Sequence, residues 1–306
     1  ENQYRELQAF VTAQPAVQSY CESPETAVNQ AHFSTVVSNN FKLPGINLDQ
    51  TVSASDSQAA PNSCAHQDFT AGNGDEGVDN QYARVVGCIP GYQSSGQANS
   101  FNTSQLTGAW GLLIKLEGVD DLINDNQVTV SLFANGDPIR LSAQREPLEY
   151  ATYTKHAESR FWASSQGKII DGVLHAGSME VRFPYDVNAM YVERVLLDAR
   201  LQLTINSEGR LDGYLGGFAP VEDQYDLEYA FRNARKNSAK GSEMSPRQRR
   251  VATSFGKASV VGYTCEGVYR ALYKHADGHY DPQRNRCTSI STQYQITAIP
   301  AFIIDD

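Results

Sequence analysis

The densest group of metal-ligand residue types lies near the C-terminus, in a segment with the spacing His-x-Asp-x-His-x-Asp. The four side chains are those of His275, Asp277, His279 and Asp281. Alternate residues of an extended segment point to the same side, so these four ligands can converge on one ion. Two imidazoles and two carboxylates suit Zn²⁺, Cu²⁺ or Fe²⁺. The spacing therefore predicts a transition-metal site, and with it a metal-handling or redox protein.

Two other interpretations of this segment stay open. In one, Asp277, Asp281 and Asn285 occupy positions one, five and nine of a calcium loop, although Pro282 stands where such a loop has glycine. In the other, no ion binds and the segment is a turn that ends a helix, with Gly278 just beyond the last helical residue.

A second candidate site lies between residues 68 and 80, where acidic residues are interleaved with glycines. The oxygen ligands are Asp68, Asp75, Glu76 and Asp79. Carboxylate oxygens on a flexible loop are the ligands that Ca²⁺ takes, and glycines allow backbone carbonyls to turn inward. We therefore expect Ca²⁺ as a cofactor. Because the spacing differs from that of the EF-hand loop, a solvated acidic turn is the alternative.

Five cysteines indicate the compartment in which the chain folds. No Cys-x-x-Cys pair occurs, which argues against zinc ribbons and thioredoxin-like redox sites. Cysteines 22 to 24 residues apart in polar sequence are typical of disulfides. We predict the pairs Cys64–Cys88 and Cys265–Cys287, with Cys21 left over. Five reduced cysteines in a cytosolic protein are the alternative.

The first residue of the chain and the length of its apolar runs indicate the cellular compartment of the protein. The first residue is Glu1 rather than methionine, which fits the removal of a signal peptide. No run approaches the ~18 apolar residues of a membrane helix, so no transmembrane segment is expected. Together with the predicted disulfides, these features favour a secreted or periplasmic protein.

A basic stretch between residues 232 and 250 contrasts with the rest of the chain. It holds seven Lys and Arg residues and one Glu, whereas the whole chain has a net charge of −10. Such a stretch can dock an acidic partner or another copy of the chain, or it can pair with the acidic body of its own chain. Nucleic acid is not an expected partner, because aromatic residues are not interleaved with these cations.

Signatures of common catalytic sites are missing from the sequence. It contains no G-x-S-x-G, no Walker A motif, no H-E-x-x-H and no G-x-G-x-x-G placed between a strand and a helix. We therefore favour a non-enzymatic binding or structural protein stabilised by disulfides and calcium. Because carboxylates are plentiful, a secreted hydrolase that uses them on a polysaccharide is an alternative, and carbohydrate is a possible partner in either case.

These candidate residues need a scaffold, and the clearest structural signals lie between residues 108 and 220. Apolar residues recur at every second position over residues 195–205, and again over 128–133, after which Asn135-Gly136 supplies a turn. Residues 169–174 have the pattern of a hairpin around Asp171-Gly172. Short strands with one wet face predict a mainly β fold with an antiparallel β-sandwich or jelly-roll core.

The two flanking segments differ from this core in composition. Residues 1–107 predict a short helix over 1–20, followed by an irregular region pinned by a disulfide. Residues 221–306 predict a helical segment packed on the core, with helices over 247–254 and 264–275 and a final strand over 294–304.

Overall fold

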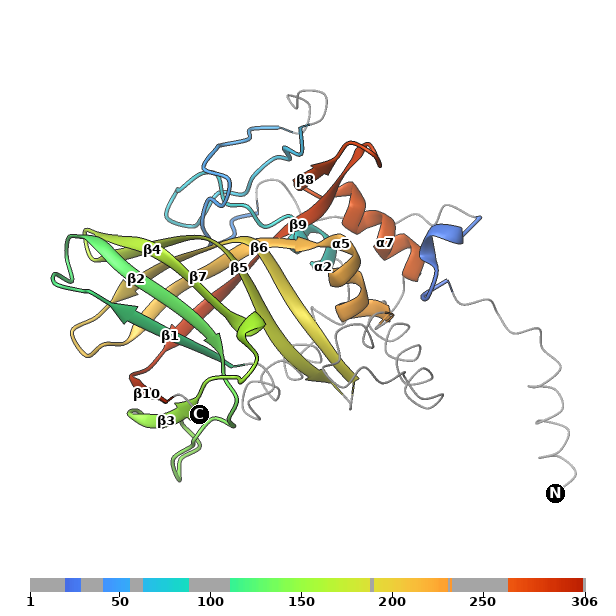
Figure 1. Cartoon of the computed structure of the whole chain (residues 1–306). Helices are drawn as coiled ribbons and strands as arrows, with labels where there is room; N and C mark the ends of the chain where they lie inside the picture. Colours follow the sequence, from blue (N-terminus) through green and yellow to red (C-terminus); the bar gives the residue numbers. More distant parts are fainter. Residues whose placement is uncertain are drawn as a thin grey trace, which may run out of the picture.

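In a computed structural model, the described residues of the 306-residue chain are 20–28, 41–55, 63–87, 111–187, 190–230, 232 and 264–304. Eight strands form one antiparallel sheet in the order β1-β2-β4-β5-β6-β7-β9-β8, and β3 pairs in parallel with β10 (Figure 1). The predicted mainly β, antiparallel fold is confirmed. The strands are β1 (Leu112–Glu117), β2 (Asp125–Ala134), β3 (Ala151–Thr154), β4 (Trp162–Ile170), β5 (Val173–Val187), β6 (Met190–Ile205), β7 (Leu211–Pro220), β8 (Gly278–Asp281), β9 (Arg286–Ala298) and β10 (Ala301–Ile304).

Local sequence explains the two-residue connection between β4 and β5. β4 and β5 are joined by Asp171 and Gly172, which have φ angles of 50° and 79°. A two-residue hairpin loop needs positive φ at both positions, which Asp and Gly tolerate better than other residues. The predicted hairpin over residues 169–174 is therefore confirmed.

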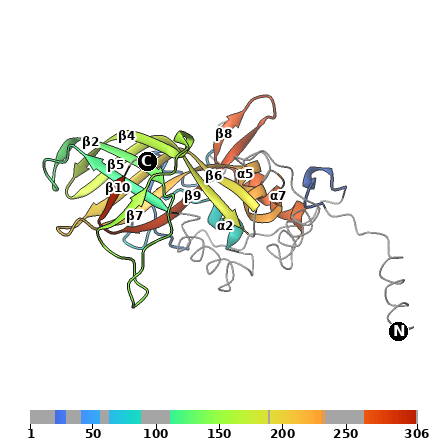
Figure 2. The same cartoon turned by 60° about the horizontal axis from the view of Figure 1, so that its bottom comes forward.

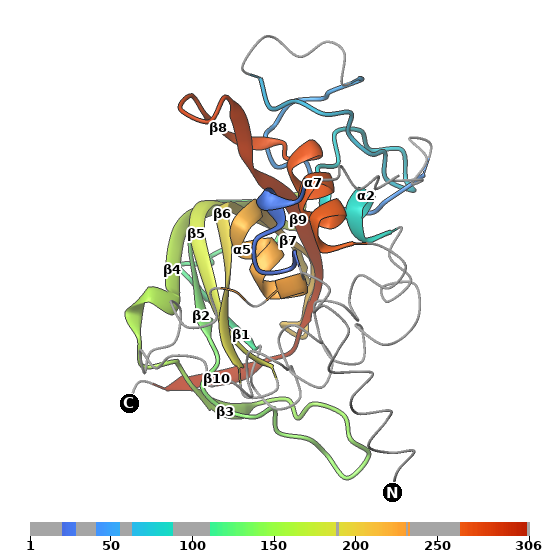
Figure 3. The ribbon, with the colours of Figure 1, turned by 90° about the vertical axis from the view of Figure 1, so that its right-hand side faces the viewer.

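The large sheet is strongly curved, and its inner face encloses the main hydrophobic core (Figure 3). Val128, Val130 and Leu132 of β2 point inward and are at most 1% exposed, as are Leu174 of β5 and Leu215 of β7. Pairing is continuous across all eight strands. The two layers expected of a sandwich are thus two halves of one curved sheet. The sheet also extends past residue 220, because β8 and β9 belong to it.

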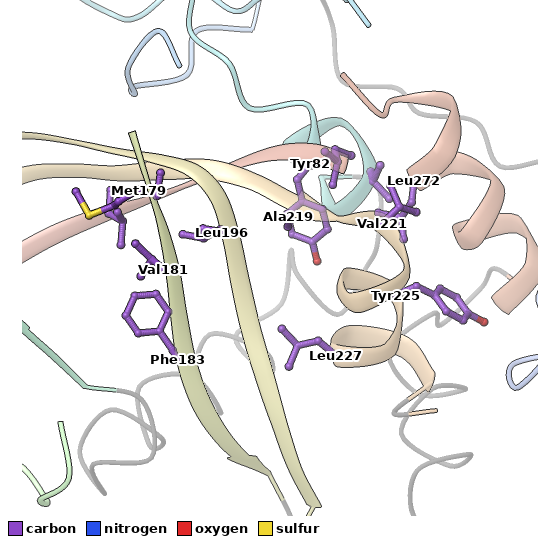
Figure 4. Close-up of a cluster of buried hydrophobic side chains, with 14 of the residues drawn as sticks. Tyr82, Met179, Val181, Phe183, Leu196, Ala219, Val221, Tyr225, Leu227 and Leu272 are labelled. Carbon is purple, nitrogen blue, oxygen red and sulfur yellow. The ribbon is translucent and has the colours of Figure 1, made fainter. Parts of the chain in front are cut away.

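Helices gather at one end of the sheet, away from β3 and β10 (Figure 2). They are α2 (Tyr82–Val86), α5 (Val221–Tyr225), the π-helical turn η4 (Asp226–Ala230) and α7 (Cys265–Lys274); two 3-10 turns, η1 (Pro24–Thr26) and η3 (Ser159–Phe161), complete the described helical residues. Tyr82, Val221 and Leu272 bring three of these helices into one buried cluster with strand residues (Figure 4).

α7 confirms the helix predicted over residues 264–275. The Thr264 hydroxyl accepts a hydrogen bond from the backbone N–H of Gly267 and so caps the first turn. The predicted strand over 294–304 is split between β9 and β10, which end and begin on either side of Pro300. The helices predicted over 247–254 and, apart from Tyr20, over 1–20 lie outside the described residues.

β6 changes face at Asp198, and this change corrects part of the predicted alternation. Leu196 and Ala199 both face the main core, whereas Leu197 packs on the other side of the sheet. Asp198 has a φ angle of 48°, and the pairing of β6 with both neighbours shifts around it. An extra residue in one strand moves every preceding side chain to the opposite face. The predicted pattern therefore holds from Ala199 to Ile205 and is wrong for Leu197.

The disulfides also differ from the predicted pairs. Cys21 is bonded to Cys265, and Cys64 is bonded to Cys287. Cys88 lies outside the described residues. Both bonds join the N-terminal region to the C-terminal segment, over sequence separations of 244 and 223 residues. The predicted pairs followed proximity in sequence, whereas the fold brings α7 and β9 beside the N-terminal segments.

Candidate functional site

The structure does not bring the four side chains of the His-x-Asp-x-His-x-Asp segment together. His275 is buried at the end of α7, with its ring centroid 6.0 Å from that of His66. Asp277 accepts a 2.6 Å hydrogen bond from the backbone N–H of Ser291. His279 has a φ angle of 53°, which interrupts the extended conformation that convergence requires.

Asp281, the fourth of these residues, closes a turn and binds no neighbour from the segment. Its Oδ1 accepts from the backbone N–H groups of Gln283 and Arg284. Asn285 accepts from the Tyr280 hydroxyl. Within the described part of the chain, no three His, Cys, Asp or Glu side chains are grouped as a metal ion would require.

The acidic loop over residues 68–80 is divided into an exposed part and a buried part. Asp75 and Glu76 lie exposed at the tip, where the Asn73 amide donates to Asp75 at 2.7 Å. Asp79, by contrast, is 4% exposed. Asp68 is half-buried and accepts from the backbone N–H of Ser53 at 2.6 Å.

Asp49, Asp68 and Asp277 lie near enough to Asp79 for their charges to act on it, and we call these four residues the carboxylate cluster. Asp277 was predicted for the other candidate site. Asp79 Oδ2 accepts from the backbone N–H groups of Leu48 (2.6 Å) and Asp49 (3.2 Å). Burial, together with the negative charges of Asp49, Asp68 and Asp277, raises the pKa of Asp79 to about 8. Loss of hydration likewise raises the pKa of Asp277 to about 7.

One glutamine forms hydrogen bonds that hold the segment around Ile46 next to the carboxylate cluster. Gln293 of β9 donates to the carbonyl oxygens of Ile46 and Asp79, each at 2.6 Å, and accepts from the Ile46 N–H at 2.8 Å. All three bonds link residues more than 200 positions apart in sequence. Gln293 thereby holds the segment around Ile46 against the outer face of the sheet.

A chain of hydrogen bonds runs through His279 on the same outer face. His279 Nδ1 lies 2.6 Å from Ser289 Oγ, and Nε2 lies 2.9 Å from Asp198 Oδ2. Asp198 also accepts from Ser178 Oγ at 2.7 Å, and this bond together with that of His279 holds the pKa of Asp198 below its usual value.

The order Ser–His–Asp is that of a nucleophilic site, but the geometry here is structural. Ser289 is 1% exposed, and a Cβ atom added to the neighbouring Gly278 would lie 2.6 Å from its hydroxyl. The Phe218 ring packs edge-on against the imidazole, with centroids 5.7 Å apart. A substrate carbonyl has no room beside Ser289, so the chain of bonds ties together β5, β6, β8 and β9.

A polar groove of about 600 Å³ opens on the outer face of β4, β5 and β6, where residues 46–50 cross the sheet. Five amide side chains contribute to its wall: Asn47, Gln50, Asn126, Gln166 and Gln202. Amides both donate and accept hydrogen bonds, so this wall can match either hydroxyls or carboxylates.

The groove also contains the basic residues Lys168, His175 and Arg200, and its lining includes no Asp or Glu. With its amide oriented to accept, Gln50 receives two hydrogen bonds from the Arg200 guanidinium, at 2.8 and 2.6 Å. Arg200 Nε is shielded from water and has no acceptor among the described residues. Burial and the charge of Lys168 lower the pKa of His175 and so favour its neutral ring.

Sequence reasoning did not identify this groove, although part of the signal was present. The alternation over residues 195–205 places Arg200 and Gln202 on the face opposite the core, as the structure confirms. The segment over 46–50 that completes the groove is irregular, and bonds to residues distant in sequence, those of Gln293, Asp79 and Arg200, fix its position.

Only one member of the predicted basic stretch over 232–250 lies among the described residues. Arg232 forms ion pairs with Asp226 and Glu222, and its Nη1 lies 3.8 Å from Glu25. This arginine therefore serves the packing of the helical end. The remaining members fall outside the described residues, so docking through this stretch stays a prediction.

Comparisons with protein-family models, with curated proteins and with solved structures gave no match to this chain. Among the described residues, no helix is long and apolar enough to cross a membrane. The two disulfides indicate folding in an oxidising environment.

Proposed function

We propose that this chain is a secreted or periplasmic binding protein without catalytic activity, and that its polar groove takes an acidic saccharide. One observation carries the proposal: on a chain of net charge −10, the groove lining holds two cations and five amides but no carboxylate. Local positive potential on an acidic protein attracts an anionic ligand. The volume of about 600 Å³ lies within the range of small-molecule sites, roughly 300–1,000 Å³.

The chemistry of the lining supports a sugar acid as the ligand. The Lys168 ammonium and the Arg200 guanidinium suit a carboxylate, and the buried Nε–H of Arg200 supplies a donor that needs an acceptor. The amides suit sugar hydroxyls, because both partners donate and accept. A ligand with a carboxylate among several hydroxyls meets all of these groups.

The two alternative functions find less support in the described residues. A polysaccharide hydrolase needs two carboxyl groups facing each other in an open groove, roughly 5–9 Å apart, and the lining of this groove has none. A metal-handling protein would use His275, Asp277, His279 and Asp281, which point to different neighbours.

Calorimetric titration with galacturonic acid oligomers tests the proposal, with neutral galactose oligomers as the matched ligand. We expect the acidic oligomer to bind and the neutral one to bind at least tenfold more weakly, because a charge-assisted hydrogen bond contributes roughly 1.5–3 kcal/mol. Lys168→Gln and Arg200→Gln should each weaken the binding of the acidic oligomer by roughly tenfold or more.

Lys115→Gln is the control, because Lys115 is an exposed cation on β1 that pairs with Glu117 outside the groove. It should leave the affinity unchanged. Equal binding of the acidic and neutral oligomers, or no binding of the acidic one, would overturn the proposal. Release of reducing ends during the titration would show catalysis and would contradict its non-enzymatic part.

A further inference from the structure

A second cavity lies where the curved sheet fails to close on itself. Among the described residues, β1 pairs only with β2, and the part of β9 beyond Ser289 pairs only with β7. A cavity of about 810 Å³ lies between β1 on one side and the end of β9 with the start of β7 on the other. We call it the seam cavity.

Aliphatic side chains dominate the wall of the seam cavity. Leu112, Ile114 and Leu116 of β1 contribute from one side, and Ile205 and Ala298 from the other. These five residues are only partly buried, and they pack against the edge of the main core. The cavity is therefore continuous with the apolar inner face, and an inserted chain would exchange water for contact with the core.

The charged side chains in the lining of the seam cavity are those of Arg210 and Glu146. The Arg210 guanidinium pairs with Glu149 and lies near Glu208. Its Nε is shielded from water and makes no hydrogen bond among the described residues, and Glu208 Oε2 lies 3.6 Å from it. A buried donor without an acceptor costs free energy, so a ligand oxygen at this position would be favourable.

We infer that the seam cavity binds a free long-chain fatty acid, with the alkyl chain between β1 and β9 and the carboxylate at Arg210. Burial of each CH₂ group contributes roughly 0.8 kcal/mol, so a long aliphatic chain gains more here than a short one. The carboxylate supplies the acceptor that Arg210 Nε lacks. This inference is independent of the proposed function, because the polar groove lies on the other face of the sheet and shares no lining residue with the seam cavity.

Equilibrium dialysis of the delipidated, disulfide-intact protein against radiolabelled palmitate tests the inference, with hexadecanol and octanoate as comparison ligands. We expect palmitate to bind more tightly than both, because hexadecanol lacks the charge and octanoate lacks the length. Arg210→Gln should weaken the binding of palmitate by roughly tenfold and leave the binding of hexadecanol nearly unchanged. Absence of palmitate binding, or equal binding of palmitate and hexadecanol, would overturn the inference.

Two variants test where the alkyl chain of palmitate binds. Ala298→Phe and Leu116→Trp each enlarge a side chain in the wall, and each should abolish palmitate binding while a thermal melt and intact disulfides report the fold. Lys168→Gln, in the polar groove, is the control and should bind palmitate like the wild type. Undiminished palmitate binding in a folded Ala298→Phe or Leu116→Trp protein would overturn the assignment. Binding of phosphatidylcholine vesicles with no uptake of free palmitate would overturn it as well.

Discussion

At the scale of single residues, Asp79 shows how burial and charge repulsion set the pH dependence of stability. Its carboxyl is 4% exposed and accepts backbone hydrogen bonds from Leu48 and Asp49, yet three other carboxyl groups act on it. The folded state raises its pKa from 3.8 to about 8, so folding favours the protonated form. This contribution to stability is complete below pH 3.8 and is lost as pH rises through about 8.

Asp79→Asn should therefore flatten the pH profile of stability. The amide oxygen can still accept from the two backbone N–H groups, and the side chain no longer ionises. The wild-type free energy of unfolding should fall by up to about 1.4 kcal/mol per pH unit on account of Asp79 between pH 5 and 8, and the variant should lack this fall. Urea unfolding across this range measures it. Asp75→Asn, at the exposed tip of the same loop, is the control; equal slopes in the wild type and Asp79→Asn would contradict the prediction.

Thermal melts of the wild type and Asp79→Asn test the calcium prediction for the residues of this loop. An ion that binds only the folded state raises the melting temperature as its concentration increases. If Ca²⁺ binds beside Asp79, millimolar Ca²⁺ at pH 8 stabilises the wild type more than Asp79→Asn. Identical responses to Ca²⁺ and to a chelator in both proteins would remove calcium from this part of the molecule.

At the scale of elements, the bulge between β5 and β6 reverses the inward face of β6. Gly177 of β5 has a φ angle of 132°, and a Cβ atom there would lie 2.6 Å from the carbonyl oxygen of Ala199. Opposite it, Asp198 takes a left-handed conformation and binds Ser178 and His279. These contacts hold the bulge in place between the polar groove, which Gly177 lines, and the hydrogen bond of His279, which Asp198 accepts.

Gly177→Ala should destabilise the protein by at least about 2 kcal/mol, because both the φ angle and the close carbonyl oppose a methyl group. Gly72→Ala is the matched control, since Gly72 has no atom within 4 Å of an added Cβ and no positive φ. Chemical unfolding of the two variants measures the difference. A stability loss in Gly177→Ala no larger than in Gly72→Ala would show that the bulge adapts freely.

Alternation predicted β2 and the second half of β6, because one face of each is buried along its length. It could not predict the bulge, whose cause is the meeting of Asp198 with Ser178 and His279 from other strands. For the candidate sites, too, the sequence predicts the residue types, whereas the fold determines which residues lie together. Asp68, Asp79 and Asp277 were identified by residue type, but only the fold brings them together. The polar groove required the position of residues 46–50, which depends on Gln293 and has no local signal.

At the scale of the whole molecule, two disulfides join the N-terminal region to the last strands and helix. Each closes a loop of more than 200 residues, for which the chain-entropy model gives roughly 5 kcal/mol of stabilisation. The fold around them places residues from the beginning, middle and end of the chain in one core. Stability therefore depends on covalent links between distant parts of the sequence.

Replacing Cys64 and Cys287 together by serine should lower the free energy of unfolding by about 2–5 kcal/mol. The segment around Asp79 should become more accessible to protease, because that bond ties it to β9. Gln283→Ser, at an exposed position in the turn before β9, is the control and should preserve stability. Peptide mapping without reduction should recover Cys21 with Cys265 and Cys64 with Cys287; recovery of Cys64 with Cys88 would contradict the structure.

The long separation of the bonded cysteines also bears on biosynthesis. Cys21 and Cys64 leave the ribosome more than 200 residues before their partners. During that interval Cys64 has Cys88 within 24 residues, and closure of a short loop has the lower entropic cost. A Cys64–Cys88 bond formed in that interval would have to be exchanged once β9 has been made. We therefore expect maturation to depend on a disulfide isomerase, and oxidants alone to trap nascent chains in a mispaired form.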